Sequence, residues 1–272
     1  MAPGTTGAER RLVALDLDGT LLSYAGEMAS AVHDAVTAVR AAGHEVVLAS
    51  GRSLISMLPV AQHLGIGSGW MVCSNGAVTV RLDPELPEGW VAEDVVTFDP
   101  EPALSLLRHE LPDARYAVEE LGVGFRMTEY FPDGELEGVH VVVPLEDLWS
   151  SEVTRVIVRS PESTSERFHE LVEHLGLDDV TYAVGWSAWM DLAPLGVSKA
   201  TALEQVRRRT RVQPHRTVAI GDGRNDVEML RWAARGVAMG HADDVVRASA
   251  DEVTGTVDDD GAVTVLRSLL AR

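Results

Sequence analysis

Short apolar runs with almost no polar alternation mark the first part of the chain. This pattern is typical of central strands covered on both faces, because an exposed face would carry polar side chains at every second position. The runs span residues 11–17, 44–50 and 70–73. We therefore predict three buried strands of one sheet.

Helical periodicity separates these runs. Between Ser30, the expected N-cap, and Gly43, expected after the last turn, apolar residues recur every three or four positions. Residues 53–65 predict a second helix, in which Pro59 should introduce a kink or mark the start. Two helices that link three buried strands indicate parallel strands with right-handed crossovers.

A turn at 74–77 and a short strand at 78–82 follow the third buried strand. The alternation of strands and helices then stops and returns near the C-terminus. The later pattern predicts a helix at 198–209, a strand at 217–223, a helix at 226–236, a strand at 236–240 and a helix from about residue 261. The fold class expected from this alternation is α/β, with a doubly wound parallel sheet.

Residues 84–187 break this rhythm. They contain most of the prolines and all four phenylalanines of the chain, with short strand patterns and up to two helices. The strand patterns lie at 91–98, 122–130, 153–160 and 180–185. We interpret 84–187 as an inserted α+β domain, so that 1–83 and 188–272 together form the core domain.

Composition narrows the partners. The 272 residues are 46% hydrophobic and carry a formal net charge of −19, which argues against nucleic acid, because phosphate backbones are bound by clustered cations. An apolar leader segment and a run of eighteen apolar residues are both missing, so neither a signal peptide nor a membrane span is expected. The lone cysteine, Cys73, cannot form an intramolecular disulfide, which fits a reducing cytoplasm.

The basic residues are divided unevenly. The chain has 22 arginines but a single lysine, Lys199. A chain that uses Arg wherever a cation is needed keeps a Lys either by chance or where a compact ammonium is required, and composition alone favours neither explanation.

Polar residues that carry chemistry follow the predicted strands or begin a helix. They form DLDGT at 16–20, SGR at 50–52, SK at 198–199 and GDGRND at 221–226. Ligands of open α/β sheets bind beyond the carboxyl ends of the strands, so these segments are expected to share one site. Buried carboxylates need a compensating cation, which predicts a positive group or a metal ion there.

These segments resemble, in the same chain order, the four motifs of the haloacid dehalogenase (HAD) superfamily. SGR, NGA at 75–77, the lysine that starts a helix and GDGRND are similar to its Cof-type sugar-phosphatase branch, subfamily IIB, in which a C2-type cap lies between the second and third motifs. The resemblance covers about residues 10–82 and 188–272, and implies a HAD-like Rossmannoid core with 84–187 as the cap.

The resemblance assigns catalytic roles to the first motif. Asp16 is the expected nucleophile, since a carboxylate that attacks phosphorus divides one difficult displacement into two easier ones. Asp18 is expected to protonate the leaving oxygen and then to activate the hydrolytic water. An aspartate at position 18 is typical of the phosphatases and mutases of the superfamily rather than its dehalogenases.

Magnesium is the cofactor that the resemblance implies. Its expected ligands are the carboxylates of Asp16 and Asp222 and the main-chain carbonyl of Asp18, because hard oxygen donors suit Mg²⁺. Asp226 is either a further ligand or a neighbour that orients Lys199 and the metal's water molecules, and we favour the second role.

Other motif residues are assigned to the phosphate and the substrate. Lys199 and the Ser50 hydroxyl are expected to contact the transferring phosphoryl group. Asn225 should bond a phosphate oxygen or support Lys199, and Arg52 is either a phosphate ligand or a surface residue at a helix start. The full expected set is Thr20, Ser50, Gly51, Arg52 and Asn225.

The resulting primary hypothesis is a Mg²⁺-dependent phosphomonoester hydrolase of the cytoplasm. Its expected partner is a small phosphorylated metabolite, most often a sugar phosphate in the family it resembles, with neither nucleic acid nor a membrane involved. A phosphosugar mutase that uses the same aspartyl-phosphate is the first alternative. A non-catalytic module that binds a phosphorylated ligand is the second.

Overall fold

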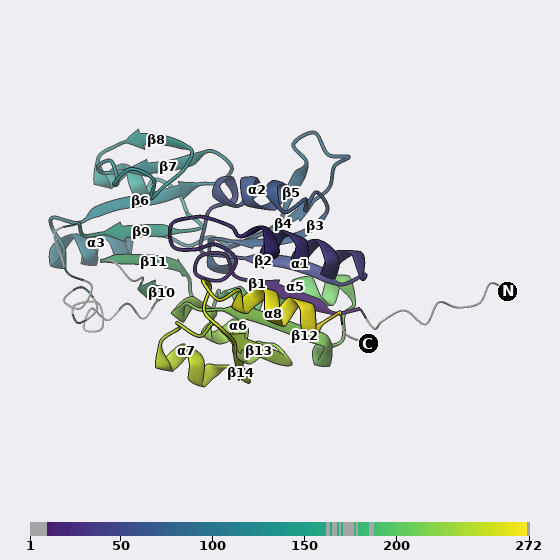
Figure 1. Ribbon diagram of the computed structural model, residues 1–272. Coiled ribbons are helices and arrows are strands. Elements are labelled where there is room, and N and C mark those ends of the chain that lie inside the picture. Colours follow the sequence, from purple (N-terminus) through teal and green to yellow (C-terminus); the bar gives the residue numbers. More distant parts are fainter. Residues whose placement is uncertain are drawn as a thin grey trace.

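The computed structural model describes residues 10–161, 164, 168, 170, 177, 179–184 and 188–270. Within these ranges the chain forms an eight-stranded and a six-stranded sheet. Figure 1 shows the second sheet and helix α3 beside one end of the first sheet. No helix of the described residues is both long and apolar enough to cross a membrane.

The eight-stranded sheet has the order β14-β13-β12-β1-β2-β3-β4-β5. The strands β1, β2, β3, β12, β13 and β14 are parallel, and β4 and β5 add an antiparallel edge. They span β1 Leu12–Leu15, β2 Glu45–Ala49, β3 Gly69–Cys73, β4 Val78–Leu82, β5 Trp90–Val95, β12 Thr217–Gly221, β13 Arg235–Ala238 and β14 Glu252–Val253. The doubly wound α/β fold is confirmed.

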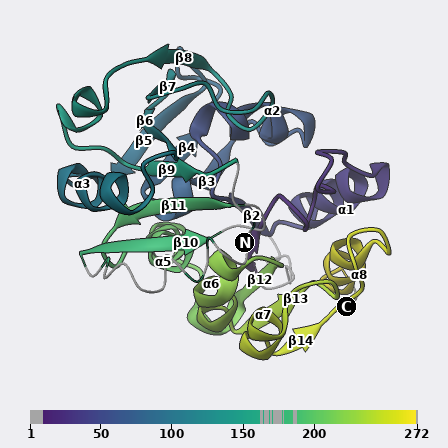
Figure 2. The ribbon, with the colours of Figure 1, turned by 90° about the vertical axis from the view of Figure 1, so that its left-hand side faces the viewer.

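Helices cover both faces of this sheet. They span α1 Ser30–Ala41, α2 Leu54–His63, α5 Lys199–Thr210, α6 Val227–Trp232, α7 Asp244–Ser249 and α8 Gly261–Ser268. Val13 and Leu15 pack with α1, α2 and α8, whereas Leu12 and Ala14 pack with α5, α6 and α7. Figure 2 shows α1 and α8 on the side opposite to α5 and α6. Burial on both faces explains why the strands lack polar alternation.

The site is placed by the order of the strands. From β1 the chain moves outward through β2 and β3, and after the second sheet it returns to β12 on the other side of β1. A reversal of this kind leaves a crevice beyond the carboxyl ends of the two central strands. The segments after β1 and β12 therefore flank one crevice.

The six-stranded sheet, here called the cap sheet, has the order β10-β11-β9-β6-β7-β8. It comprises β6 Arg115–Glu120, β7 Gly124–Met127, β8 Val139–Val142, β9 Val156–Arg159, β10 Val180–Val184 and β11 Trp189–Pro194, with α3 Glu101–Glu110 against one face. A cluster that includes Phe125, Met127 and Phe131 fills part of the other face. Each face is thus covered by apolar side chains.

The expected domain boundaries do not match the strand pairing. β5 lies beyond residue 83 yet pairs with β4 of the first sheet, and β11 lies beyond residue 187 yet pairs with β9 and β10 of the cap sheet. We still propose an inserted domain, but with its limits moved from 84 and 187 to near the ends of β5 and β11. The sequence pattern missed this because a strand's apolar pattern does not say which sheet it joins.

Three local expectations are corrected. Ala29, not Ser30, is the N-cap of α1, since its backbone is extended and Ser30 already lies in the helix. The start of α2 is not Pro59, which lies inside a helix that begins at Leu54. The helix expected at 226–236 ends at Trp232, because the backbone extends at the next residue to enter β13.

A buried carboxylate joins the cap sheet to the core. Glu119 of β6 accepts hydrogen bonds from the Ser74 hydroxyl at 2.5 Å and from the Thr154 hydroxyl at 3.4 Å. Burial raises the pKa of Glu119, while the charge of Arg155 opposes that rise. Ser74 directly follows β3, so this contact holds the cap sheet against the edge of the crevice.

Candidate active site

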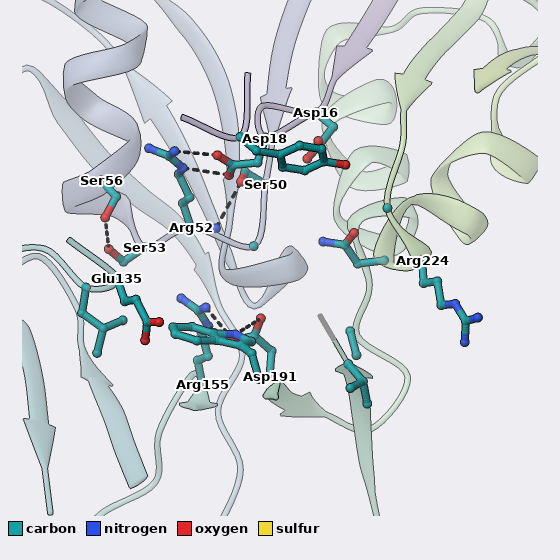
Figure 3. Close-up of a pocket in the computed structure, with 18 of the residues that line it drawn as sticks. Asp16, Asp18, Ser50, Arg52, Ser53, Ser56, Glu135, Arg155, Asp191 and Arg224 are labelled. Carbon is teal, nitrogen blue, oxygen red and sulfur yellow. Dashed lines mark hydrogen bonds and ion pairs between the residues drawn. The ribbon is translucent and has the colours of Figure 1, made fainter. Parts of the chain in front are cut away.

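The four polar segments meet at the carboxyl ends of β1, β2 and β12. Asp16 follows β1, Ser50 follows β2, Asp222 follows β12 and Lys199 begins α5. Figure 3 shows Asp16, Asp18 and Ser50 on one side of the cavity between the two sheets. The four segments that were expected to lie together therefore do so.

Lys199 lies between two aspartates. Its Nζ is 2.6 Å from Oδ1 of Asp16 and 2.6 Å from Oδ1 of Asp226, and its side chain is fully buried. Ser198 provides the N-cap of α5 by accepting from the Thr201 amide, which fixes where the helix begins. A buried ammonium shared by two carboxylates explains why this position holds the chain's only lysine.

The buried charges perturb one another. Burial raises the pKa of Asp16 well above its ordinary value, and the neighbouring Asp226 adds to the rise, while Lys199 opposes it. Burial by itself would lower the pKa of Lys199, but attraction to Asp16 and Asp226 outweighs burial and raises it. Lys199 therefore favours the charged form of Asp16, against the larger effects of burial and Asp226.

Asp222 is held by residues of the loop after β1. Its Oδ1 accepts from the Thr20 hydroxyl at 3.1 Å and its Oδ2 from the Tyr24 hydroxyl at 2.5 Å. Nε2 of His241 lies 3.5 Å from the same Oδ2. Burial raises the pKa of Asp222, and Asp226 raises it further, whereas the two hydroxyls oppose the rise.

The carboxylates form a donor set that fits a divalent cation. One oxygen each of Asp16, Asp222 and Asp226 lies within 4.8 Å of the others, and all three residues are buried. Oδ2 of Asp226 already accepts from the amides of Asp222 at 3.0 Å and Gly223 at 2.9 Å, and its Oδ1 binds Lys199. Hard oxygens suit Mg²⁺, and Asp226 is more engaged in orienting its neighbours than the other two.

Gly19→Ala is expected to abolish activity and lower stability. Gly19 has a φ of +79°, and a Cβ built there would lie 2.3 Å from Oδ2 of Asp222. The new methyl group would displace the Asp222 carboxylate and strain the turn. Phosphate release and the thermal midpoint would measure both effects, with Gly26→Ala as the control, because Gly26 has a similar φ of +80° but open space around it. Equal effects of the two changes would contradict the role of close approach.

Arg52 contacts Asp18. Its Nε and Nη2 donate to the two carboxylate oxygens of Asp18 at 2.8 and 2.6 Å. This forked pair fixes the plane of the carboxylate better than a single bond would. The Asp18 side chain is 43% exposed, and both residues line the cavity. Arg52 is therefore not a free surface residue, and its role as a phosphate ligand remains a proposal.

Ser50 and Asn225 lie at the rim of the same cavity. Ser50 is buried, and its hydroxyl accepts from the Arg52 amide at 3.2 Å. Asn225 donates from Nδ2 to Oδ1 of Asn75 at 2.9 Å, and no direct bond to Lys199 is present among the described side chains. Gly51 allows a close approach, since a Cβ there would be 3.1 Å from Oδ1 of Asn75.

Sequence reasoning missed several residues that line the cavity. Tyr24 and His241 flank Asp222, and the cap sheet contributes Arg155, Trp189 and Asp191. The cavity has a volume of about 1080 Å³. No short motif marks these positions, because they lie in loops or in cap strands whose partners are distant in the sequence.

Comparisons with known proteins agree with this geometry. The model of the haloacid dehalogenase-like hydrolase family matches residues 13–91 and 128–266. The chain is 28% identical to pyridoxal phosphate phosphatase YbhA of Escherichia coli, over 90% of this chain and 93% of that protein. It is 27% identical to phosphatase BT1666 of Bacteroides thetaiotaomicron, whose solved structure superposes with a TM-score of 0.76 over 98% of this chain and 97% of the other.

A second solved structure shares the fold. The HAD subclass IIB sugar phosphatase BT4131 superposes with a TM-score of 0.78, at 23% identity, over 95% of this chain and 98% of the other. Its similarity supports the arrangement of core and cap sheets. The family match spans most of the chain, including the segments that hold Asp16, Lys199 and Asp222. The chain therefore belongs to the haloacid dehalogenase-like hydrolase family, in its Cof-type branch, and is a phosphatase.

Proposed function

We propose that the protein is a Mg²⁺-dependent phosphomonoester hydrolase that forms a covalent intermediate on Asp16. The observation that carries the proposal is the buried Lys199 ammonium, 2.6 Å from both Asp16 and Asp226, beside the Asp222 carboxylate. A site for a neutral ligand has no need for so many buried charges, whereas a transferring phosphoryl group needs both a nucleophile and positive charge around its oxygens.

In the first half of the reaction, an Asp16 carboxylate oxygen attacks phosphorus. The new Asp16–phosphorus bond forms as the bond to the leaving oxygen breaks, and Asp18 gives its proton to that oxygen. Lys199 keeps Asp16 oriented for attack and offers an N–H to a phosphoryl oxygen. The carboxylates of Asp16 and Asp222 and the main-chain carbonyl of Asp18 would hold Mg²⁺, which would supply positive charge to offset repulsion between the carboxylates and the phosphate.

In the second half, Asp18 accepts a proton from a water molecule. That water attacks phosphorus, the bond to Asp16 breaks, and inorganic phosphate leaves with Asp16 restored. The forked bond from Arg52 fixes the plane of the ionised Asp18 carboxylate, which is the form that accepts a proton from water. Asp18 is exposed enough to reach water, whereas Asp16 is buried, which fits their different roles.

The proposed substrate is a small phosphorylated metabolite, with sugar phosphates as the first class to examine. The cavity of about 1080 Å³ has room for a phosphate and a leaving group of that size. The relatives are named for pyridoxal phosphate and for sugar phosphates, so both classes belong in a substrate panel.

A phosphate-release panel tests this function. Purified protein should release inorganic phosphate from several monophosphates with Mg²⁺, lose that activity in EDTA, and regain it when Mg²⁺ is restored. Glucose 1-phosphate also distinguishes the mutase, which would produce glucose 6-phosphate without free phosphate. Binding of phosphorylated compounds without any turnover would overturn the hydrolase proposal, as would full activity in EDTA.

A further inference from the structure

The cap side of the cavity contains an ion pair that the proposed chemistry does not use. Nε and Nη2 of Arg155 lie 2.7 and 2.5 Å from Oδ1 of Asp191. The side chains are only 6% and 15% exposed, and both line the cavity. Figure 3 shows this pair on the side of the cavity opposite to Asp16 and Asp18. It therefore faces the region where the leaving group of a bound phosphate ester would lie.

The second oxygen of Asp191 is also held. Nε1 of Trp189 donates to Oδ2 at 3.1 Å, so the carboxylate has a fixed orientation. Each carboxylate oxygen has two acceptor positions; Arg155 takes both positions of Oδ1, so Oδ2 keeps one for a further donor. Trp189 lines the same wall, its ring packed edge-on against Phe131 with centroids 5.9 Å apart. The wall thus combines a fixed acceptor with an aromatic surface.

Charge on this wall is balanced. Arg155 is matched by Asp191, and Arg159 by Glu135, whose oxygens lie 3.0 and 3.2 Å from Nε of Arg159. Glu137 adds an acidic side chain to the cavity lining, where its charge also acts on Arg52. A wall without surplus positive charge accepts hydroxyl donors but repels a second anion. The Lys199 ammonium and the Arg52 guanidinium lie instead at the phosphate end, beside Asp16 and Asp18.

We infer that Asp191, held by Arg155 and Trp189, is the residue that selects the leaving group. It accepts hydrogen bonds from hydroxyl groups of a neutral, hydroxylated leaving group, and it disfavours compounds that carry a second phosphate. This inference rests on the proposed hydrolase function. The competing explanation is that the pair only ties β11 to the start of β9, in which case its loss would affect all substrates alike.

Asp191→Asn distinguishes the two explanations, because the amide keeps an oxygen for Arg155 but removes the charge. We would compare kcat/KM for glucose 6-phosphate and for phenyl phosphate, whose leaving group has no hydroxyl besides the reacting oxygen. The variant should lose roughly tenfold on glucose 6-phosphate, mainly through KM, and change less than about twofold on phenyl phosphate. Trp189→Phe should give a smaller loss in the same direction.

A substrate that carries a second phosphate provides an independent test of the role of Asp191. Wild-type protein should favour glucose 6-phosphate over glucose 1,6-bisphosphate by roughly tenfold, and Asp191→Asn should narrow that ratio, because the Arg155 charge is no longer balanced. Glu129→Gln is the matched control, since Glu129 is an exposed cap carboxylate outside the cavity lining. Thermal midpoints of all variants would show that they are folded.

The outcomes separate the inference from the function on which it rests. Equal losses on both monophosphates, or none, would overturn the role of Asp191 while leaving the hydrolase intact. Wild-type preference for the bisphosphate would also overturn it. Failure of wild-type protein to release phosphate from any of these compounds would overturn the proposed function itself.

Discussion

Asp16→Asn is expected to abolish phosphate release and leave the fold intact. An amide cannot form the covalent intermediate, and loss of a covalent nucleophile typically costs a factor of roughly 10⁴ to 10⁶ in kcat. The fold should tolerate the change because Asp16 is a buried carboxylate close to Asp222 and Asp226, so removal of its charge relieves repulsion. Lys199 keeps Asp226 as a partner.

Phosphate release at saturating substrate and the thermal midpoint would be measured together for this variant. Asp258→Asn serves as the control, since Asp258 is an exposed aspartate in the loop before α8. We expect the Asp16 variant to be inactive with an unchanged or higher midpoint. Residual turnover above about a hundredth of wild type would rule out Asp16 as the nucleophile.

Of the variants proposed for this protein, Lys199→Met should lower the stability of the fold most. Methionine fills much of the same space but leaves the Asp16 and Asp226 carboxylates buried without their shared cation. Breaking a buried ion pair from one side typically costs about 3 to 5 kcal/mol in the free energy of unfolding. Denaturation in EDTA would measure this, since a divalent cation could otherwise compensate for the lost ammonium.

The control for this change is Arg208→Met, which removes a cation from the same helix at a position that is 65% exposed. It should lower the free energy of unfolding by about 1 kcal/mol or less.

Lys199→Arg tests the shape of the cation instead of its charge. A planar guanidinium is too large for a fully buried site built around a compact ammonium, so activity should fall severely although the charge remains. Retention of half the activity by Lys199→Arg would remove this explanation of the lone lysine.

The end of the cavity that is lined by Asp16 and Asp222 could be anticipated from the sequence, because its parts follow local patterns. Apolar runs indicated the central strands. The polar residues after β1, β2 and β12 had to lie close together, because the carboxyl ends of parallel strands share one edge of the sheet. That argument predicted the meeting of Asp16, Lys199 and Asp222 across about two hundred residues of chain. Their chemical roles remain proposals that the variants above test.

Other features depended on contacts that no local pattern encodes. The contacts of Tyr24 and His241 with Asp222 join loops that carry no shared motif, and the pairing of Arg52 with Asp18 depends on one side-chain conformation. The limits of the proposed inserted domain are hard to place from the sequence for a similar reason. β5 and β11 look like ordinary short strands, and only pairing shows which sheet each one joins.

The sequence by itself determined the α/β architecture and which polar segments gather at the carboxyl ends of the strands, because strand burial and motif spacing are properties of short segments. Only the tertiary structure decided what lines the cap end of the cavity. Arg155 and Asp191 come from antiparallel neighbours separated by a long stretch of chain, and their ion pair exists only after β9 and β11 align. Long-range register is set by the whole packed sheet, so it cannot be read from the residues alone.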